Sequence, residues 1–426
     1  MTLGRFLYKI LTYMMTPFLG VFFRRRIKSG KEAPETRNER FARSLAPRPD
    51  GKLIWLHAAS VGESQLLLEL VRRLLRTGKR NLSILMTCQT KTGANLISTA
   101  FNEDSELKQI CCNHQMAPFD TPGGAKRFVR HWSPDLAIFA EGEIWPNLLL
   151  ALRANGTPAT LINARMTENS IKGWMRWRKT AKAVFNCFDL LIAADVQTQT
   201  GLEALSGQSV ENPGNLKSAL PTPAVKDQQL HDLTKAIGDR KILLAASTHA
   251  GEEALVLDAY MRLPSDTFMI IAPRHPERGD EVDALLSCTK YAISRRSEGD
   301  PVTDATNILL ADTMGEMGLW YRLADTVYLG GGHAPGVGGH NPLEALRLEK
   351  PILTGPSLFN FKDLTERLTG HQGFSIIEDA EGLAEGFPAA PVSAELSAIL
   401  EADAMGPMAK TLELLEPLLQ RAELAE

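Results

Sequence analysis

The chain has 426 residues, of which 44% are hydrophobic and 23% charged, and its formal net charge is -3 at pH 7. This length and composition exclude a disordered or low-complexity chain and predict about two globular domains. The small net charge gives no bulk attraction for nucleic acid, so we expect no nucleic-acid partner.

The first 28 residues are apolar and then abruptly basic. The uncharged run from Ile10 to Phe23 is shorter than the ~20 residues that span a bilayer, and extending it to Leu3 admits Arg5 and Lys9. No signal-peptide cleavage site follows. The segment is therefore either an uncleaved anchor or, as we favour, a monotopic helix lying in the membrane interface. Both place the body at the cytoplasmic face, and a buried core helix is the remaining alternative.

Apolar, strand-like runs then alternate with helical patterns in two successive halves, which predicts α/β domains with open parallel sheets. The expected strands are 52–58, 81–88, 114–120, 135–143, 157–165 and 189–196, then 241–248, 268–275, 308–313, 326–332, 351–356 and 374–379. A Pro- and Gly-rich linker, 210–227, separates the halves. We expect an N-terminal membrane segment at 1–28, followed by two Rossmann-like domains at 29–212 and 213–426. This order resembles the GT-B architecture, in which two such domains face each other across a cleft, and the resemblance implies that the first binds the acceptor and the second the nucleotide sugar.

Five cysteines are present, an odd number that suits a reduced cytoplasmic setting better than a disulfide framework. The adjacent pair in "CCNH", residues 111–114, lacks the second half of a metal site. We expect these to be core or strand-end residues, and we expect no metal site.

In open parallel sheets, ligands bind at the carboxyl ends of the strands. Glu63 follows the first such end and stands three residues after Ser60, which is the spacing of a helix capping box. The spacing by itself favours a cap, and the helix terminus would lower the pKa of Glu63. A carboxylate at this position is also a candidate general base, and the two interpretations remain open at this point.

The second half carries a glycine-rich stretch, 329–346, between a strand and a helix expected to begin near Asn341 and Pro342. Glycines and a helix N-terminus suit an anionic ligand, and Glu344 is placed to accept bonds from ribose hydroxyls. Arg274 would add a permanent cation after another strand. The sequence contains no P-loop motif.

A basic stretch, 170–182, interleaves Trp174 and Trp177 with cations. It either touches lipid headgroups or acceptor phosphates, or it is a solvated helix with two packed tryptophans. Both interpretations remain open.

Eight motifs occur in an order that resembles the 3-deoxy-D-manno-octulosonic acid (Kdo) transferase family. They are "SVGE" 60–63, "EGEIWPN" 141–147, "NAR" 163–165, "GNLK" 214–217, "ASTHAGEE" 246–253, "APRHPER" 272–278, "DTMGEMG" 312–318 and "GGHNPLEAL" 338–346. The sequence departs from the family pattern at Gly142, where threonine is usual, and at His333, where serine is common.

The resemblance implies a GT-B enzyme of lipopolysaccharide biosynthesis at the cytoplasmic face of a Gram-negative inner membrane. Its donor would be CMP-Kdo, a substrate rather than a cofactor, and its acceptor a lipid A precursor of the lipid IVA type. Glu63 maps to the general base of an inverting displacement, and Glu141 and Lys217 map to residues that support the transition state. The CMP contacts map to Pro273, Arg274, Met314, Gly315, Glu316, Asn341, Pro342, Leu343 and Glu344.

We expect the reaction to be independent of metal, because no carboxylate-rich metal signature stands out. The alternatives are another GT-B sugar-nucleotide enzyme (a UDP-sugar transferase or an epimerase) and a non-catalytic, membrane-tethered protein that binds a nucleotide sugar.

Overall fold

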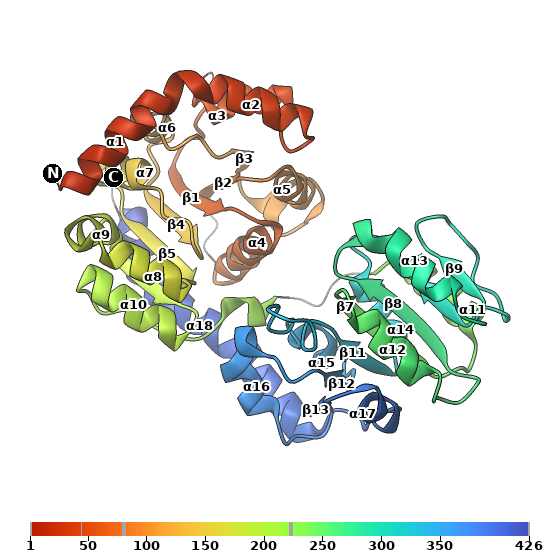
Figure 1. Cartoon of the computed structure of the whole chain (residues 1–426). Helices are drawn as coiled ribbons and strands as arrows, with labels where there is room; N and C mark the ends of the chain where they lie inside the picture. The colour runs from red at the N-terminus through yellow and green to blue at the C-terminus, as the bar shows by residue number, and fades with distance from the viewer. Residues whose placement is uncertain (1, 44, 79–81, 221–224, 425–426) are drawn as a thin grey trace. The chain divides into compact units, whose positions relative to one another are not determined.

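The computed structural model describes residues 2–43, 45–78, 82–220 and 225–424. The chain forms two compact units, one comprising Met1–Leu220 with Asp403–Glu426 and the other Pro221–Ala402 (Figure 1). Each unit contains one open, wholly parallel sheet with helices on both faces, so the predicted α/β fold of Rossmann-like domains is confirmed.

The sheet of the first unit has the order β3-β2-β1-β4-β5-β6. Its strands are β1 (Lys52–Ala58), β2 (Leu82–Cys88), β3 (Cys112–Met116), β4 (Leu136–Ala140), β5 (Ala159–Ala164) and β6 (Leu190–Ala193). β1 pairs with β2 on one side and with β4 on the other. The order of the strands therefore reverses at β1, and in folds of this kind ligands bind at the carboxyl ends beside such a reversal.

Alternate residues of β1 enter two different cores. Leu53 and Trp55 pack on one face of the sheet, whereas Ile54 and Leu56 pack on the other, and all four are fully buried. The helices of this unit are α3 (Arg37–Arg40), α4 (Val61–Arg76), α5 (Lys91–Glu103), α6 (Pro122–Trp132), α7 (Pro146–Asn155), α8 (Glu168–Met175), α9 (Arg178–Phe185) and α10 (Val196–Ser206). Helices α4 and α5 cover one face of the sheet, and α6, α7, α9 and α10 cover the other face.

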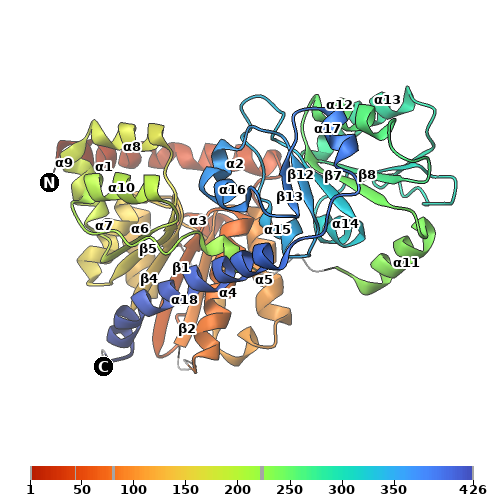
Figure 2. The same ribbon diagram turned by 90° about the horizontal axis from the view of Figure 1, so that it is seen from below.

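The N-terminal segment is helical and lies along the first unit as α1 (Leu3–Met15) and α2 (Leu19–Lys28) (Figures 1 and 2). Tyr8 on α1 donates a hydrogen bond of 2.9 Å to Oδ2 of the buried Asp120. Phe23 on α2 is only 1% exposed, whereas Met14 and Phe18 are 65% and 70% exposed. One side of the segment is therefore docked on the protein while the other presents apolar side chains. Residues 1–28 were expected to form a separate part, but they belong to the first unit.

The sheet of the second unit has the order β13-β12-β11-β7-β8-β10-β9. Its strands are β7 (Ile242–Thr248), β8 (Phe268–Pro273), β9 (Ile293–Arg295), β10 (Ile308–Leu310), β11 (Thr326–Leu329), β12 (Ile352–Thr354) and β13 (Phe374–Ile376). The strand order reverses between β7 and β11, which pair directly. β9 was not expected, because its polar three-residue sequence carries no apolar run and it forms by pairing with β10 at the sheet edge.

The helices of the second unit are α11 (Asp227–Ile237), α12 (Glu252–Tyr260), α13 (Gly279–Ser287), α14 (Met317–Leu323), α15 (Leu343–Leu346), α16 (Lys362–Leu368) and α17 (Ala380–Glu385). Leu244 and Ala246 of β7 face one core of this unit, and Leu243 and Ala245 face the other. The sheet is thus covered on both faces, as its continuous apolar strands predict.

The expected domain boundaries are wrong at both ends of the second unit. The last helix, α18 (Ala394–Leu424), buries Leu396 in the second unit, but Met408 and Leu415 lie in a core of the first unit. Leu216, expected in the linker, is also buried in the first unit. Apolar burial therefore extends the first unit to Leu220 and returns 403–426 to it. Part of the expected linker, 221–224, lies outside the described residues.

We expect Tyr8→Phe to weaken the attachment of α1, because it removes the hydrogen bond to the Asp120 carboxylate. The loss should lower the free energy of unfolding of the first unit by about 1.5–3 kcal/mol, the usual range for a bond to a charged group. Denaturant titration of the variant and the parent protein in the same detergent measures the change in the free energy of unfolding. Tyr13→Phe on the same helix is the control, since Tyr13 is 71% exposed; an equal loss in both variants would contradict the assignment.

Candidate active site

The carboxyl end of β1 leads directly into the first turn of α4, and this turn positions Glu63. Ser60 caps the helix, its Oγ accepting from the Glu63 N–H at 3.3 Å. The Glu63 carboxylate accepts from the Ala59 N–H at 2.7 Å and from the Ser60 hydroxyl at 2.8 Å. Glu63 thus takes part in the cap, although it reaches the N–H of Ala59 and not that of Ser60.

Burial raises the pKa of Glu63 above its usual range, and the negative charges of Glu141 and Glu143 act in the same direction. Together they outweigh the hydrogen bonds from Ala59 and Ser60, which favour the ionised form. The net shift is therefore opposite to the one expected from the helix terminus alone. A carboxylate whose pKa is raised toward neutrality is a stronger base, so its role in the cap does not prevent a catalytic one.

Glu141 follows β4 directly and forms an ion pair with Lys217, whose Nζ lies 2.6 Å from its Oε1. Asn163 on β5 joins the two segments: its Nδ2 donates to Glu141 Oε1 at 3.3 Å, and its Oδ1 accepts from the Leu216 N–H at 2.8 Å. A Cβ at Gly62 would lie 3.4 Å from Lys217 Nζ. The structure thus brings the three predicted catalytic residues to one edge of the first sheet, beside the reversal at β1.

Three further residues of this edge, His57, Glu143 and Trp145, were not predicted as site residues. His57 is fully buried at the end of β1, and its Nε2 lies 2.9 Å from Glu143 Oε2. Trp145 Nε1 donates to the same oxygen at 2.7 Å. Burial opposes ionisation of Glu143, but the bonds from His57 and Trp145 outweigh it and hold its pKa below the usual range. The signal that could have found them is a histidine inside an apolar strand and a second carboxylate in "EGE".

The predicted nucleotide contacts lie in the second unit, at the carboxyl ends of its strands. Pro273 ends β8, and Arg274 after it is exposed. Arg274 and Arg347 are the cations that act on the Glu344 carboxylate. Leu343 begins α15, a single turn that starts slightly later than expected because Asn341 Oδ1 accepts from the Leu343 N–H at 3.2 Å. Pro342 is the residue before this turn.

The loop after β10 holds the remaining predicted contacts. Met314 is 75% exposed, and Gly315 has a φ of +85°, a conformation that favours glycine. Glu316 is paired with Arg296, whose Nη2 lies 2.6 Å away, and accepts from Thr313. The Arg296 bond holds the pKa of Glu316 below its usual range. This carboxylate is therefore a charged acceptor.

Glu252 holds the start of the glycine-rich loop, a role that sequence reasoning missed. Its carboxylate is 1% exposed and accepts from the N–H groups of Gly331 at 2.8 Å, of His333 at 3.0 Å and of His249 at 3.0 Å. Tyr328 OH lies 2.9 Å from His333 Nδ1. A buried carboxyl group thus ties the ends of β7 and β11 together, so this loop is packed in place.

His340 and His249 form a second contact between these loops. Their Nε2 atoms lie 2.8 Å apart, and the rings stack with an interplanar angle of 11°. Burial lowers the pKa of His340 to about 4, and the charge of Arg274, or a proton on His249, acts in the same direction. The pair is therefore neutral at pH 7, with one imidazole donating to the other.

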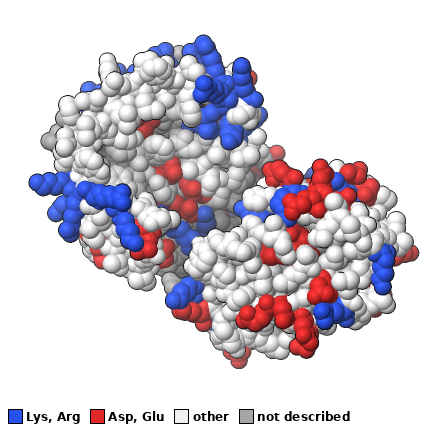
Figure 3. All heavy atoms as spheres, viewed as in Figure 1, with Lys and Arg blue, Asp and Glu red and all other residues white. Residues whose placement is uncertain are grey.

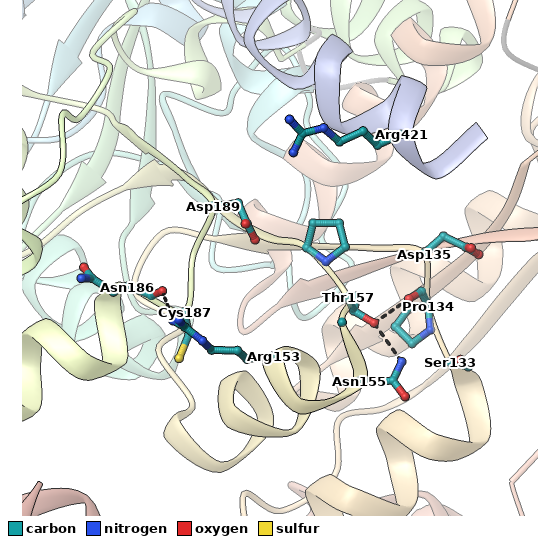
Figure 4. Close-up of a pocket in the computed structure, with 12 residues that line it drawn as sticks. Ser133, Pro134, Asp135, Arg153, Asn155, Thr157, Asn186, Cys187, Asp189 and Arg421 are labelled. Carbon is teal, nitrogen blue, oxygen red and sulfur yellow. Dashed lines mark hydrogen bonds between the residues drawn. The ribbon is translucent and has the colours of Figure 1, made fainter. Parts of the chain in front are cut away.

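Other candidate sites are set aside by the structure. Among the described residues, no group of three or more His, Cys, Asp or Glu side chains is suited to a metal ion. Cys112 begins β3, as the strand-end interpretation of "CCNH" predicted. A cavity of about 620 Å³ lies at the amino ends of β4, β5 and β6, where Asp135 and Asp189 precede two of these strands (Figure 4). It is at the opposite edge of the sheet from Glu63.

Two Rossmann-like units, each with polar and charged side chains at the carboxyl ends of its strands, have the domain architecture of the GT-B fold class. A solved glycosyltransferase from Rickettsia africae is similar to this chain with a TM-score of 0.55, at 13% identity, over 87% of this chain and 100% of that chain. At that identity the likeness shows the fold alone.

The family model of 3-deoxy-D-manno-octulosonic-acid transferase (kdotransferase) matches residues 35–220. The 3-deoxy-D-manno-octulosonic acid transferase of Bordetella pertussis is 31% identical, over 85% of this chain and 85% of the relative. That of Haemophilus influenzae is 33% identical, over 78% of this chain and 77% of the relative. The chain belongs to the 3-deoxy-D-manno-octulosonic acid transferase family, a family of glycosyltransferases, and the resemblance stated from its motifs is confirmed.

We expect acid to destabilise the second unit partly through His340. Its pKa is about 4 in the folded chain and 6.5 when unperturbed, so only the unfolded chain takes up this proton between those values. The stabilisation is complete above pH 6.5 and is lost as the pH falls toward 4. His340→Gln should reduce the fall in Tm between about pH 7 and pH 5. His231→Gln, at an exposed site on α11, is the control; an unchanged fall in the His340 variant would contradict the prediction.

Proposed function

We propose that the chain transfers Kdo from CMP-Kdo to a lipid A precursor of the lipid IVA type, in the biosynthesis of the lipopolysaccharide inner core. Membership of the family supports the transferred sugar. The observation that carries the mechanism is the buried Glu63 carboxylate, held beside the Glu141–Lys217 pair at the reversal of the first sheet.

The proposed reaction is a direct displacement with inversion at the anomeric carbon. Glu63 takes the proton of an acceptor sugar hydroxyl as that oxygen forms a bond to the anomeric carbon. The bond from this carbon to the CMP phosphate oxygen breaks, and CMP leaves with the electron pair. Lys217, held by Glu141, supplies a cation to the negative charge that develops in this transition state.

The donor nucleotide is proposed to bind in the second unit, at the residues predicted from the motifs. Arg274 is an exposed cation suited to the phosphate, and the glycine-rich loop allows close approach of the backbone. Glu344 would accept from ribose hydroxyls. We propose that Arg274 and the backbone N–H groups of the glycine-rich loop stabilise the negative charge of the leaving phosphate. We propose in addition that the reaction requires neither a metal ion nor a cofactor.

We further propose that the first unit rests on the cytoplasmic face of the inner membrane, with α1 and α2 in the interface. Within the described residues, the segment Leu3–Lys28 is the one helix long and apolar enough to cross a membrane. Its docking through Tyr8 and its exposed apolar side favour the interfacial arrangement over a spanning one. Lys and Arg side chains gather over α2 and over α8–α9 (Figure 3), where they suit anionic headgroups.

The two tryptophans of the basic stretch lie in different surroundings, one packed and one exposed. Each therefore fits one of the two interpretations that the sequence left open. Trp174 packs against Phe185 with ring centroids 5.2 Å apart. Trp177 is 50% exposed between Arg176 and Arg178. We propose that Trp177 enters the headgroup region while Trp174 holds the helix in place.

The full chain in detergent, incubated with CMP-Kdo and a tetraacylated lipid A precursor, should add Kdo to the precursor, as detected by mass analysis. The yield should be the same with a chelator present, because cationic side chains of the protein stabilise the negative charge of the leaving phosphate. No product from CMP-Kdo, but turnover of a UDP-sugar, would assign another GT-B activity. Loss of activity in chelator that Mg²⁺ restores would refute the metal-independent mechanism.

Glu63→Gln should lower kcat by about 10²–10⁴-fold, the usual contribution of a general base. The amide oxygen can still accept from the Ala59 N–H, and the amide group can still bond to Ser60, so the cap is retained. Single-turnover kinetics measures the loss, and circular dichroism checks the fold.

The matched control is Glu69→Gln on the same helix, where the carboxylate pairs with Arg72 and Arg73 instead of facing the site edge. It should transfer Kdo at close to the parent rate. A Glu63→Gln variant that folds and keeps the parent rate would contradict the catalytic assignment and leave Glu63 with a role in the helix cap alone.

A further inference from the structure

The first turn of α7 is capped by a residue from a distant loop. Trp145, which precedes the helix, has no side-chain oxygen that could cap it. Instead the Asp120 carboxyl group accepts from the Asn147 N–H at 3.1 Å and from the Leu148 N–H at 2.8 Å. The Asn147 side chain returns to the same segment, its Nδ2 donating to the Asp120 carbonyl at 2.7 Å. Asp120 therefore fixes the point at which α7 begins.

This helix start also closes the loop that carries Glu141 and ends at Trp145. At the other end of the loop, the Glu141 N–H donates to the Ile162 carbonyl at 3.0 Å. Trp145 bonds back to Glu143, two residues from Glu141, at 2.7 Å. A Cβ at Gly142, between them, would meet none of the described atoms within 4 Å. The course of the loop therefore depends on these bonds and on the position of the α7 start.

Helix α1 supports the cap of α7 from its other side. Tyr8 OH donates to Asp120 Oδ2 at 2.9 Å, and this oxygen also accepts from the Asn147 N–H. One turn later, Thr12 Oγ1 accepts from Asn147 Nδ2 at 3.1 Å. The Thr12 hydroxyl can donate to the Tyr8 carbonyl, 2.8 Å away, while it accepts this bond. Two residues of α1 thus contact the two residues that hold the start of α7.

The docked side of α1 is a stripe of residues four apart, and α1 lies against α6 and α9 (Figure 1). A Cβ at Gly4 would lie 2.5 Å from Thr180 Oγ1 of α9, so the two helices pack closely there. Tyr8 and Thr12 continue the stripe toward α7. The opposite side of α1 carries the exposed apolar side chains Leu3, Phe6 and Ile10. The helix that presents these side chains is therefore also the helix that holds the start of α7.

We propose that Tyr8 and Thr12 are positioning residues: through Asp120 and Asn147 they hold the start of α7 and with it the loop that presents Glu141. The helix that faces the membrane then contributes to the geometry of the active site and does not serve only as an attachment. The inference deepens the proposed function and rests on the assignment of Glu141 as a residue that supports the transition state. It requires no contact of α1 with either substrate.

The experiment compares two replacements of Thr12 in the full chain, assayed in detergent with saturating CMP-Kdo and lipid A precursor. Thr12→Val keeps the shape of the side chain but leaves one amide hydrogen of the buried Asn147 unpaired. A misplaced catalytic group loses rate without losing binding, so kcat should fall by about tenfold while KM for both substrates stays unchanged. Thr12→Ser keeps the hydroxyl and should have close to the parent kcat.

A double-mutant cycle with Glu141→Gln separates positioning from a general loosening of the fold. If Thr12 acts through Glu141, Thr12→Val should cause no further loss of kcat in the Glu141→Gln enzyme, because the interaction that it supports is already absent. A loss that acts through the structure as a whole would appear in full in that background. This second outcome would overturn the proposal.

Thr2→Val is the matched control for the docking of α1. Thr180 Oγ1 donates to Thr2 Oγ1 at 3.0 Å, so this change also removes one hydrogen bond of α1, at the end away from Asp120. It should keep the parent kcat, and both valine variants should bind vesicles of zwitterionic and anionic phospholipid as the parent does in flotation. An equal fall in kcat in both variants, or a fall that follows lost vesicle binding, would overturn the proposal. Should Thr12→Val fail to fold, Tyr8→Phe removes the other bond to the cap and should give the same pattern.

Failure of this inference is distinguishable from failure of the proposed function. If Glu141→Gln lowers kcat while a folded Thr12→Val enzyme keeps the parent rate, the assignment of Glu141 stands and the role of α1 is refuted. If Glu141→Gln itself keeps the parent rate, the assignment of Glu141 is refuted.

Discussion

The reversal of strand order beside β1 is the constraint on which the proposed site depends. Connections between parallel strands are right-handed, so the loops that leave β1 and β4 turn toward opposite faces of the sheet. The carboxyl ends of these strands therefore remain uncovered by their own helices. Glu63 comes from one of these loops and Glu141 from the other, and the second unit repeats the arrangement with β7 and β11.

Backbone strain also occurs at the carboxyl ends of β4, β5 and β7. Glu141, Asn163 and Ser247 have φ values of +56°, +51° and +56°, in a region that non-glycine residues rarely adopt. Asn163 and Ser247 lie where the pairing of β5 with β6 and of β7 with β8 shifts register. At Glu141 and Asn163 the strain accompanies direct contacts, because these two side chains meet each other and hold Lys217 and Leu216.

Much of the fold could be predicted from the sequence, because parallel strands buried on both faces appear as continuous apolar runs. The run 52–58 matches β1, and the run 241–248 contains β7. β9 escaped because it is short and polar, and its conformation comes from its neighbour β10. The domain boundary was not predicted because the apolar residues of α18 do not specify which unit they pack against.

The candidate site was predicted unevenly, for a related reason. Glu63, Glu141 and Lys217 stand in recognisable motifs, but His57 and Glu252 could not be assigned from their own segments. Each acts through partners distant in the sequence: His57 through Thr87 and Glu143, and Glu252 through Gly331 and His333. Only the folded chain brings such partners within hydrogen-bonding distance.

The sequence by itself determined the α/β class, the residue types at the strand ends and the family, since these depend on local patterns and on the order of motifs. The tertiary structure decided which charges face one another, and this reversed the expected pKa shift of Glu63. A helix terminus lowers the pKa of a carboxylate through local dipoles, whereas burial and like charges raise it. Burial and the approach of Glu141 and Glu143 exist only in the folded chain, and there they outweigh the local effect.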